Sequence, residues 1–396
     1  MSEHPILGLV ALGYAPVIDA QRMVTATRLS ILPLRPDASL DGAALLAALQ
    51  PAFGEPPRPV QLNLMSETGL HGLATQRLPA QAQLEWPAFM GTSPEAAEAI
   101  QAARQNGTGL LLKGLSNNPL PQELRGAFGR VQLDLDDARR LGLAALQGKN
   151  VLVGNARGAA EIDEAFKLGA ALVTGSPAVE AYEPPPGAGK PEIAADLQVI
   201  VELMSRLDQG DDVERLEQTL KRDPSLAFKL LRYMNSAAFG LPVEVSSFRH
   251  AIMLLGYALL KRWLALLLAT ASKDVNLRPV MFAAVRRGLL MEELVRATTG
   301  DEEMRNEIFI CGVFSLLDRM FRQPFAELLK SIPVPERVYM ALAENTGPYQ
   351  PYCDMVRAIE GETLDEIRHG AEQLITGFSD INRCILKALA AAGQLE

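Results

Sequence analysis

Eight short apolar runs separated by helical stretches are the feature that most constrains the fold of this chain. Amphipathic segments such as residues 93–107 and 158–170 lie between most of the runs, and they end in Asn-Gly or Leu-Gly, which are helix stop signals. Eight strands with intervening helices predict a (β/α)8 barrel. The runs cover residues 6–12, 23–32, 60–64, 81–86, 109–112, 131–135, 150–154 and 170–175.

The connection between the first two runs is too short for a regular barrel. About ten residues separate residues 6–12 from residues 23–32, which leaves no room for a crossover helix. We therefore expect the first two strands to pair antiparallel, so the predicted barrel is a modified one.

The segment EPPPGAGKPE, residues 183–192, divides the chain into two halves. Its prolines and glycines hold neither a helix nor a central strand, which is typical of a linker. After it, apolar residues recur at three- and four-residue spacing almost throughout, which is typical of helices. The sequence thus predicts an α/β barrel over residues 1–182 and an all-helical bundle over residues 193–396.

Composition and charge exclude several classes of protein. Apolar residues make up 48% of the chain and charged residues 21%, as in globular proteins. A net charge of −9 argues against a broad nucleic-acid surface. The longest apolar run, residues 263–271, is too short to span a bilayer. Three widely spaced cysteines without CxxC spacing indicate reduced thiols. We expect a soluble, cytoplasmic protein without nucleic-acid or membrane partners.

The helical half offers little catalytic chemistry. Its histidines lack metal-ligand spacing, and we interpret His250, which lies on an apolar helix, as a structural hydrogen-bonding residue. Asp318 is the one acid in the helical segment 308–321. A single carboxylate does not hold a divalent cation, so helix capping or ion pairing is the favoured role of Asp318.

Three segments of the helical half resemble the HDOD domain. They are DPSLAFKLLRYMNSAAFG, VSSFRHAIMLLGYALLKRWLALLLA and CGVFSLLDRMFRQPFAELL, and the resemblance extends from about residue 197 to residue 387. HDOD domains are the metal-less relatives of the HD and HD-GYP phosphohydrolases, in which a His-Asp pair binds metal. Here Leu317 precedes Asp318, so the pair is lost. The resemblance implies a domain without metal and without hydrolysis.

Four residues of this half are candidates for a partner surface. Asn235 and Ser236 either cap a helix and hold the following turn, or contact a partner together with Arg262 and Trp263. Lys261 and Arg262 end a polar helix face, which solvent alone can also satisfy.

The first half, over about residues 5 to 180, is similar to a decayed EAL domain. EAL domains are modified barrels that hydrolyse cyclic di-GMP with two metal ions. Arg28 stands where the family has a metal-binding Glu, and Lys113 and Gly114 replace a pair of aspartates. Asn63, Glu85 and Asp134 stand at positions where the family's residues are retained.

Further positions also depart from the EAL pattern. They are Gln132 in place of a Lys, Thr174 in place of a Gln, and Gly154, Asn155 and Arg157 in place of acid, base and acid. Two-metal hydrolysis needs several converging carboxylates. The remnant set either holds one weakly bound ion or, as we expect, pairs Arg28 and Lys113 with Glu85 and Asp134. We expect no catalytic residue, no cofactor and no metal.

The favoured function is a non-enzymatic bacterial signal-transduction adaptor that acts through contacts with other signalling proteins, with residues 183–192 as a hinge. The alternative is a metal-independent sensor that binds cyclic di-GMP through Arg28, Lys113 and Arg157 without turnover. A divergent phosphohydrolase is a third reading. DNA binding by residues 248–264 is a fourth, but the Leu and Ala of that segment suit a core better than a major groove. Partner identity, input signal and oligomeric state stay open.

Overall fold

The structure of the protein, a computed structural model, describes residues 4–115, 120–142, 144, 150–176, 195–220, 222, 223, 226, 247–298 and 301–395. The chain forms two compact units. One contains residues 1–180 together with residues 354–393, and the other contains residues 181–353 with residues 394–396. The predicted linker, residues 183–192, lies outside the described residues.

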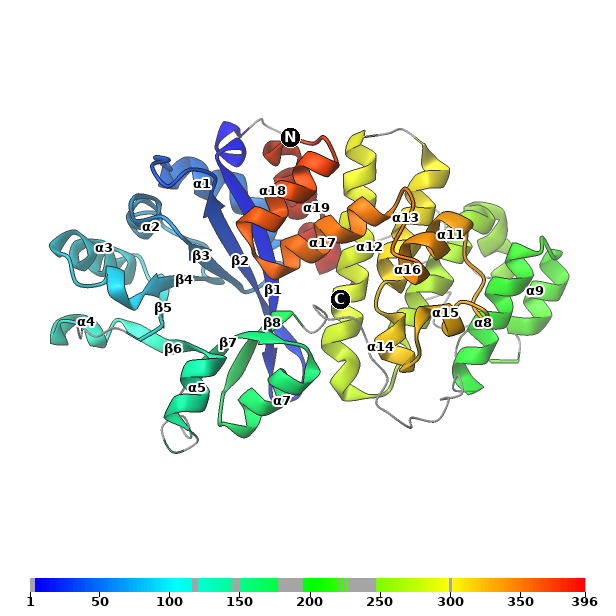
Figure 1. Cartoon of the computed structure of the whole chain (residues 1–396), viewed down its shortest axis with the longest axis horizontal. Helices are drawn as coiled ribbons and strands as arrows, with labels where there is room; N and C mark the ends of the chain where they lie inside the picture. Colours follow the sequence, from blue (N-terminus) through cyan, green and yellow to red (C-terminus); the bar gives the residue numbers. More distant parts are fainter. Residues whose placement is uncertain are drawn as a thin grey trace. The chain divides into compact units, whose positions relative to one another are not determined.

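The first unit is built on a closed barrel of eight strands in sequence order (Figure 1). Strand β1 pairs antiparallel with both β2 and β8, and the other neighbours are parallel. The predicted barrel and its antiparallel first pair are confirmed. The strands are β1 (Val10–Asp19), β2 (Val24–Pro33), β3 (Val60–Leu64), β4 (Ala82–Pro87), β5 (Gly109–Lys113), β6 (Phe128–Asp134), β7 (Val151–Arg157) and β8 (Leu172–Ser176).

The first strand lies further along the chain than the apolar run 6–12 suggests. A 3₁₀ helix, η1 (Pro5–Gly8), takes up the start of that run, and β1 then continues to Asp19 as a buried strand. A tight turn follows, in which the Asp19 carboxylate accepts hydrogen bonds from the backbone N–H groups of Gln21 and Met23. The two strands therefore form a hairpin with a much shorter connection than expected.

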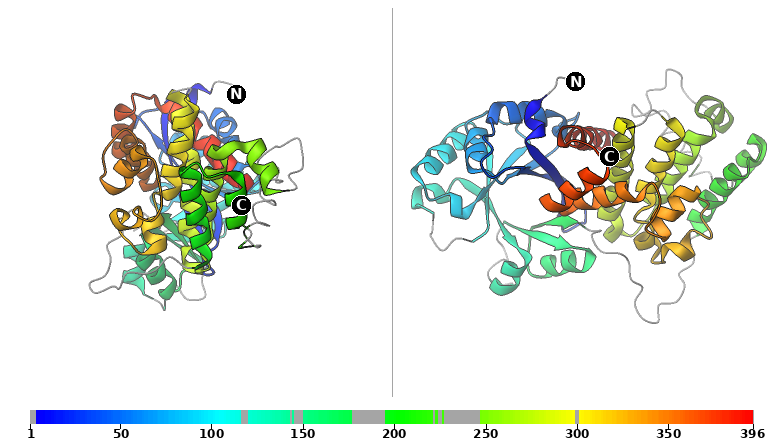
Figure 2. Two further views of the ribbon diagram at one scale, coloured as in Figure 1. Left: turned by 90° about the vertical axis from the view of Figure 1, so that its right-hand side faces the viewer. Right: turned by 45° about the horizontal axis from the view of Figure 1, so that its top comes forward.

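Helices on the outside of the barrel cover its strands (Figure 2). Three of them begin with side-chain caps, in which Asp41, Ser66 and Ser93 each accept a hydrogen bond from a backbone N–H of the first turn. The helices are α1 (Gly42–Leu49), α2 (Glu67–Ala74), α3 (Pro94–Gln105), α4 (Gln122–Arg125), α5 (Leu135–Leu141) and α7 (Ala159–Lys167).

The end of the chain supplies the remaining helices of this unit. These are most of α17 (Gln350–Gly361), then α18 (Leu364–Gln373) and α19 (Phe378–Leu395). The domain boundaries predicted from the sequence place residues 354–393 in the helical domain. In the structure these residues belong to the same compact unit as the barrel. Helical periodicity shows which face of a helix is buried but not which element it is buried against, and this explains the difference.

Strand β1 is the point at which the C-terminal helices join the barrel. Because β8 pairs only with residues 17–19 of β1, the rest of that strand edge needs another partner. Asn382 of α19 supplies part of it, since its amide oxygen accepts a hydrogen bond from Leu12 N at 3.0 Å and its amide nitrogen donates to Leu7 O and Val10 O at 2.7 and 2.8 Å. The Asn382 side chain thus continues the hydrogen-bonding pattern of the strand.

The second unit is helical throughout its described residues, as predicted. Helix α11 changes direction at Gly256, whose φ of 70° lies in the left-handed region. None of the helices in the described part of the chain is long and apolar enough to cross a membrane. The helices are α8 (Ala195–Asp208), α9 (Val213–Leu220), α11 (Phe248–Thr270), α12 (Arg278–Thr298), α13 (Glu302–Phe314), α14 (Leu317–Phe321), α15 (Phe325–Leu328) and α16 (Glu336–Ala343).

Helices α12 and α13 cross at two glycines, Gly288 and Gly312. A Cβ atom on Gly312 would lie 2.7 Å from the Cα of Gly288 and 2.7 Å from the backbone oxygen of Arg287. Since both contacts are with backbone atoms, no side chain can move aside to make room.

We therefore expect Gly312→Ala to lower the free energy of unfolding of the helical unit by about 1–3 kcal/mol, through overpacking. Urea denaturation followed by circular dichroism measures the change. Gly126→Ala is the control, because Gly126 has a φ of −76° and a Cβ there meets no atom within 4 Å. Equal effects of the two substitutions would contradict the close crossing.

Candidate functional site

Polar side chains gather inside the barrel at the carboxyl ends of its parallel strands. Side chains alternate along a strand, so Arg28 and Ser30 of β2 share one face, as do Gln61 and Asn63 of β3. A small apolar cluster of the barrel adjoins these strands and contains Val17, Leu111 and Leu152. The polar layer therefore lies where (β/α)8 barrels place their functional sites.

Arg28 and Glu85 form the centre of this layer. Arg28 Nε donates to Glu85 Oε1 at 2.6 Å, and Nη2 donates to Oε2 at 2.9 Å. The Glu85 side chain is fully buried and that of Arg28 is 8% exposed. Burial by itself lowers the pKa of Arg28, but the charges of Glu362 and Glu85 outweigh it and raise that pKa above its ordinary value. The pair is thus a buried, bidentate ion pair.

Lys113 and Asn63 lie beside this pair. Lys113 Nζ donates to Asn63 Oδ1 at 2.9 Å and lies 3.9 Å from Glu85 Oε2. Asn63 in turn donates to Ser30 Oγ at 2.7 Å. Burial and then the positive charge of Arg28 lower the pKa of Lys113. The structure thus brings four of the five predicted remnant positions, Arg28, Asn63, Glu85 and Lys113, into one cluster.

Asp134, the fifth position, differs from the expectation. Its charge favours the cationic forms of Arg28 and Lys113, but among the residues described it forms no ion pair with either. Asp134 is the last residue of β6 and its side chain is exposed, whereas Glu85 points into the interior. The expected pairing of the two cations is therefore present with Glu85 and not with Asp134.

Glu362 belongs to the cluster, and sequence reasoning missed it. It lies in the turn between α17 and α18, and its Oε2 accepts a hydrogen bond from Arg28 Nη1 at 2.5 Å. Its side chain is 18% exposed. No motif could have revealed this contact, because 334 positions separate the two residues.

The other barrel positions identified from the sequence lie apart from the cluster or play structural roles. Thr174 Oγ1 donates to the backbone oxygen of Pro16 at 2.9 Å and so ties β8 to β1. Arg157 is exposed, as is Asn155, and among the described residues no contact joins the Arg157 side chain to the cluster. Gln132 is buried, and its Nε2 lies within 3 Å of the position of a Cβ on Gly154.

Exposed apolar side chains lie in the loops that follow β3, β4 and β5. Met65, Phe89 and Leu115 are 44%, 64% and 51% exposed. Lys113 Nζ lies 4.0 Å from the sulfur of Met65, so the cation contacts one of these exposed apolar side chains. A cation beside apolar side chains suits a ligand that has both a negative and a flat apolar part.

In the helical unit, two of the four proposed partner residues are described. Trp263 is 1% exposed and packs in the core, so the prediction that it lies on a partner surface is wrong. Arg262 donates to both carboxylate oxygens of Glu292 and lies 3.7 Å from the centre of the Phe309 ring. Asn235 and Ser236 lie outside the described residues.

The remaining candidates of the helical unit have structural contacts. The Asp318 carboxylate is buried and accepts a hydrogen bond from the backbone N–H of Arg319. Ser247 caps the helix on which the half-buried His250 lies. In the parts of both units that are described, no three His, Cys, Asp or Glu side chains converge as metal ligands would.

Comparisons with known proteins match both halves of the chain. The model of the HDOD domain matches residues 193–323. The chain is 27% identical over 195 residues to the uncharacterized protein YuxH of Bacillus subtilis, covering 48% of this chain and 46% of YuxH. It is 25% identical over 177 residues to the cyclic di-GMP phosphodiesterase CdgJ of Vibrio cholerae, covering 45% and 41%. The matched region thus spans less than half the length of each curated relative.

Solved structures similar to this chain include EAL proteins. The calcium and cyclic di-GMP complex of BlrP1 from Klebsiella pneumoniae has a TM-score of 0.35 at 13% identity, with 44% of this chain and 56% of that chain covered. The EAL domain of DcpA from Mycobacterium smegmatis has a TM-score of 0.33 at 13% identity, with 42% and 90% covered. The chain thus contains an HDOD domain at residues 193–323.

Proposed function

We propose that this chain is a non-enzymatic bacterial signal-transduction adaptor in cyclic di-GMP signalling, acting in the cytoplasm through protein–protein contacts. In this proposal the barrel has lost phosphodiesterase chemistry and the HDOD domain has lost phosphohydrolase chemistry. The observation that carries the proposal is the bidentate contact of Arg28 with the fully buried Glu85.

The contact supports the proposal because it occupies the groups that a metal would need. Two-metal hydrolysis requires free carboxylate oxygens that hold the ions and polarise water. Both oxygens of Glu85 accept hydrogen bonds from Arg28, and the Oδ1 of Asn63 accepts one from Lys113. A dication at this place would meet two protein cations at close range in a poorly solvated site.

Turnover of cyclic di-GMP tests the proposal directly. The purified chain is incubated with cyclic di-GMP and Mg²⁺, Mn²⁺ or Ca²⁺, and chromatography measures the linear dinucleotide, with CdgJ as the positive control. We expect no product from this chain. Asp134→Asn serves as the diagnostic variant, since Asp134 is exposed and its replacement leaves the packing intact.

Asp136→Asn is the matched control, because Asp136 is an exposed acid of the same segment whose partner is Arg139 on α5. Metal-dependent product formation that Asp134→Asn abolishes and Asp136→Asn preserves would overturn the non-enzymatic proposal. In the source bacterium, the Asp134→Asn chain should restore the phenotype of a deletion strain as well as the unchanged chain does.

A sensor that binds cyclic di-GMP without turnover is the second candidate function. The contact of Lys113 with the exposed Met65 favours it, because phosphates and bases need neighbouring cationic and apolar surfaces. Calorimetric titration without metal distinguishes the two functions. Saturable binding that Lys113→Met removes would make the chain a sensor, whereas absence of binding leaves the adaptor.

A further inference from the structure

The turn between α17 and α18 inserts a carboxylate into the barrel cluster. Glu362 in this turn has a φ of 54°, a conformation that a side-chain-bearing residue adopts only when its surroundings hold it. Strand β1 holds the turn closely, because a Cβ on Gly13 would lie 2.9 Å from Ile359 O and 3.1 Å from the Cα of Glu362. The absence of a side chain at Gly13 therefore permits this approach.

The contacts of Arg28 differ in strength on their two sides. Glu85 binds two nitrogen atoms of Arg28 with both of its oxygens, whereas Glu362 binds one nitrogen with Oε2 alone. The second oxygen of Glu362, Oε1, is buried and has no hydrogen-bond partner among the described residues. A buried oxygen without a partner costs free energy, so the Glu362 contact is the exchangeable one.

A second cation lies near the same position. Lys113 Nζ is 3.9 Å from the Glu85 oxygen that also accepts from Arg28 Nη2, and the Lys113 side chain is 25% exposed. The charge of Glu362 favours the cationic forms of both Arg28 and Lys113, so an oxyanion with several oxygens in its place would be attracted by both cations. The position therefore suits a phosphate group, and in this structure the Glu362 carboxylate occupies it.

We propose that Glu362 is a built-in anion that occupies a phosphate-binding position formed by Arg28 and Lys113, and that a phosphate-bearing ligand binds there by displacing the α17–α18 turn. The inference rests on the second candidate function, a sensor that binds without turnover, and deepens it by naming the place of the ligand's phosphate and the carboxylate that the phosphate displaces. Ligand binding is then coupled to the position of α17, the helix that runs from Gln350 to Gly361.

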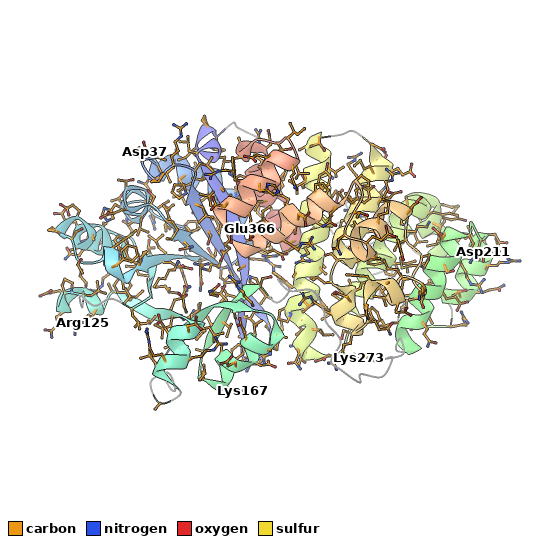
Figure 3. All side chains as sticks on the ribbon, in the orientation of Figure 1. Asp37, Arg125, Lys167, Asp211, Lys273 and Glu366 are labelled. Carbon is orange, nitrogen blue, oxygen red and sulfur yellow. The ribbon has the colours of Figure 1, made fainter. Side chains whose placement is uncertain are left out.

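Calorimetry with the full chain tests this proposal, with inorganic pyrophosphate and cyclic di-GMP as separate probes. Glu362→Ala should bind at least one of them about tenfold more tightly than the unchanged chain, because the competing carboxylate is gone. Glu366→Gln, labelled in Figure 3 on α18, is the matched control, since it removes a nearby exposed charge that has no contact with Arg28. Binding of pyrophosphate alone identifies a simple phosphate as the ligand, and binding of cyclic di-GMP alone identifies a phosphodiester.

Hydrogen exchange of the unchanged chain supplies a second measurement that does not depend on a variant folding. Saturating ligand should increase amide exchange over residues 359–367, where the turn leaves the barrel, and leave exchange of the Asp41-capped helix α1 unchanged. Equal affinities of Glu362→Ala and the unchanged chain, or ligand-independent exchange of the turn, would overturn the proposal. Chromatography of the same samples detects any linear product, so a failure of the non-enzymatic proposal is recognised separately.

Discussion

Replacing Asn382 with alanine should lower the free energy of unfolding of the barrel unit by about 3–5 kcal/mol. The side chain is fully buried, and it satisfies one backbone N–H and two backbone oxygens of the segment 7–12. Alanine would leave these three groups without partners in a place that water does not reach, and each such group costs about 1–3 kcal/mol. The effect is large because one side chain satisfies three buried backbone groups at the start of strand β1.

Urea denaturation followed by tryptophan fluorescence measures this change, since Trp86 lies in the barrel. Asn150→Ala is the matched control. Asn150 also makes side-chain hydrogen bonds, to Arg130 and Gly129, but it is exposed, so water replaces its partners. If both substitutions lowered stability equally, the C-terminal helices would not be an integral part of the barrel unit.

Replacing Arg28 with methionine should destabilise the barrel unit by about 3–5 kcal/mol. The substitution leaves the fully buried carboxylate of Glu85 without its bidentate partner, which among the described residues is the one cation within hydrogen-bonding distance of it. Lys113, at 3.9 Å and with a pKa lowered by burial, compensates only in part. Thermal and urea unfolding of the full chain give the change in stability.

A double-mutant cycle separates the ion pair from the packing of its side chains. The double variant Arg28→Met, Glu85→Met should be more stable than Arg28→Met alone, because no unpaired charge is left in the interior. Arg139→Met is the control for geometry, since Arg139 binds Glu164 through two hydrogen bonds of 2.8 Å at the exposed surface. We expect little change there. A double variant as unstable as the single one would refute the buried-charge argument.

Much of the barrel is predictable from the sequence because its strands are short, apolar and separated by well-capped helices. The start of β1 is not, since residues 6–12 are equally apolar in the 3₁₀ helix and in the strand that follows. Hydrophobicity indicates that a residue is buried but not its conformation, and this run is largely buried in both the 3₁₀ helix and the strand.

The part of the cluster that lies on the barrel strands can be predicted from the sequence, because the strands themselves can be. Arg28 lies within β2, Glu85 lies within β4 and Lys113 ends β5, and all three strands belong to one parallel run of the barrel, so their convergence follows once the strands are identified. Glu362 and Asn382 do not follow, because their contacts depend on where remote helices pack. Trp263 was misplaced for a related reason: Lys261 and Arg262 precede it on a polar stretch, and only the packing of α11 places its ring in the core.

The arrangement of the barrel unit in the sequence also determines the order of its assembly during synthesis. All eight strands leave the ribosome before residues 354–393, with the whole helical unit translated in between. Until α19 emerges, the Leu12 N–H lacks the Asn382 partner, and the edge of β1 stays open to pairing with other chains. We therefore expect a chain that ends before α19 to contain all eight strands and yet to associate through the edge of β1 more readily than the full chain does.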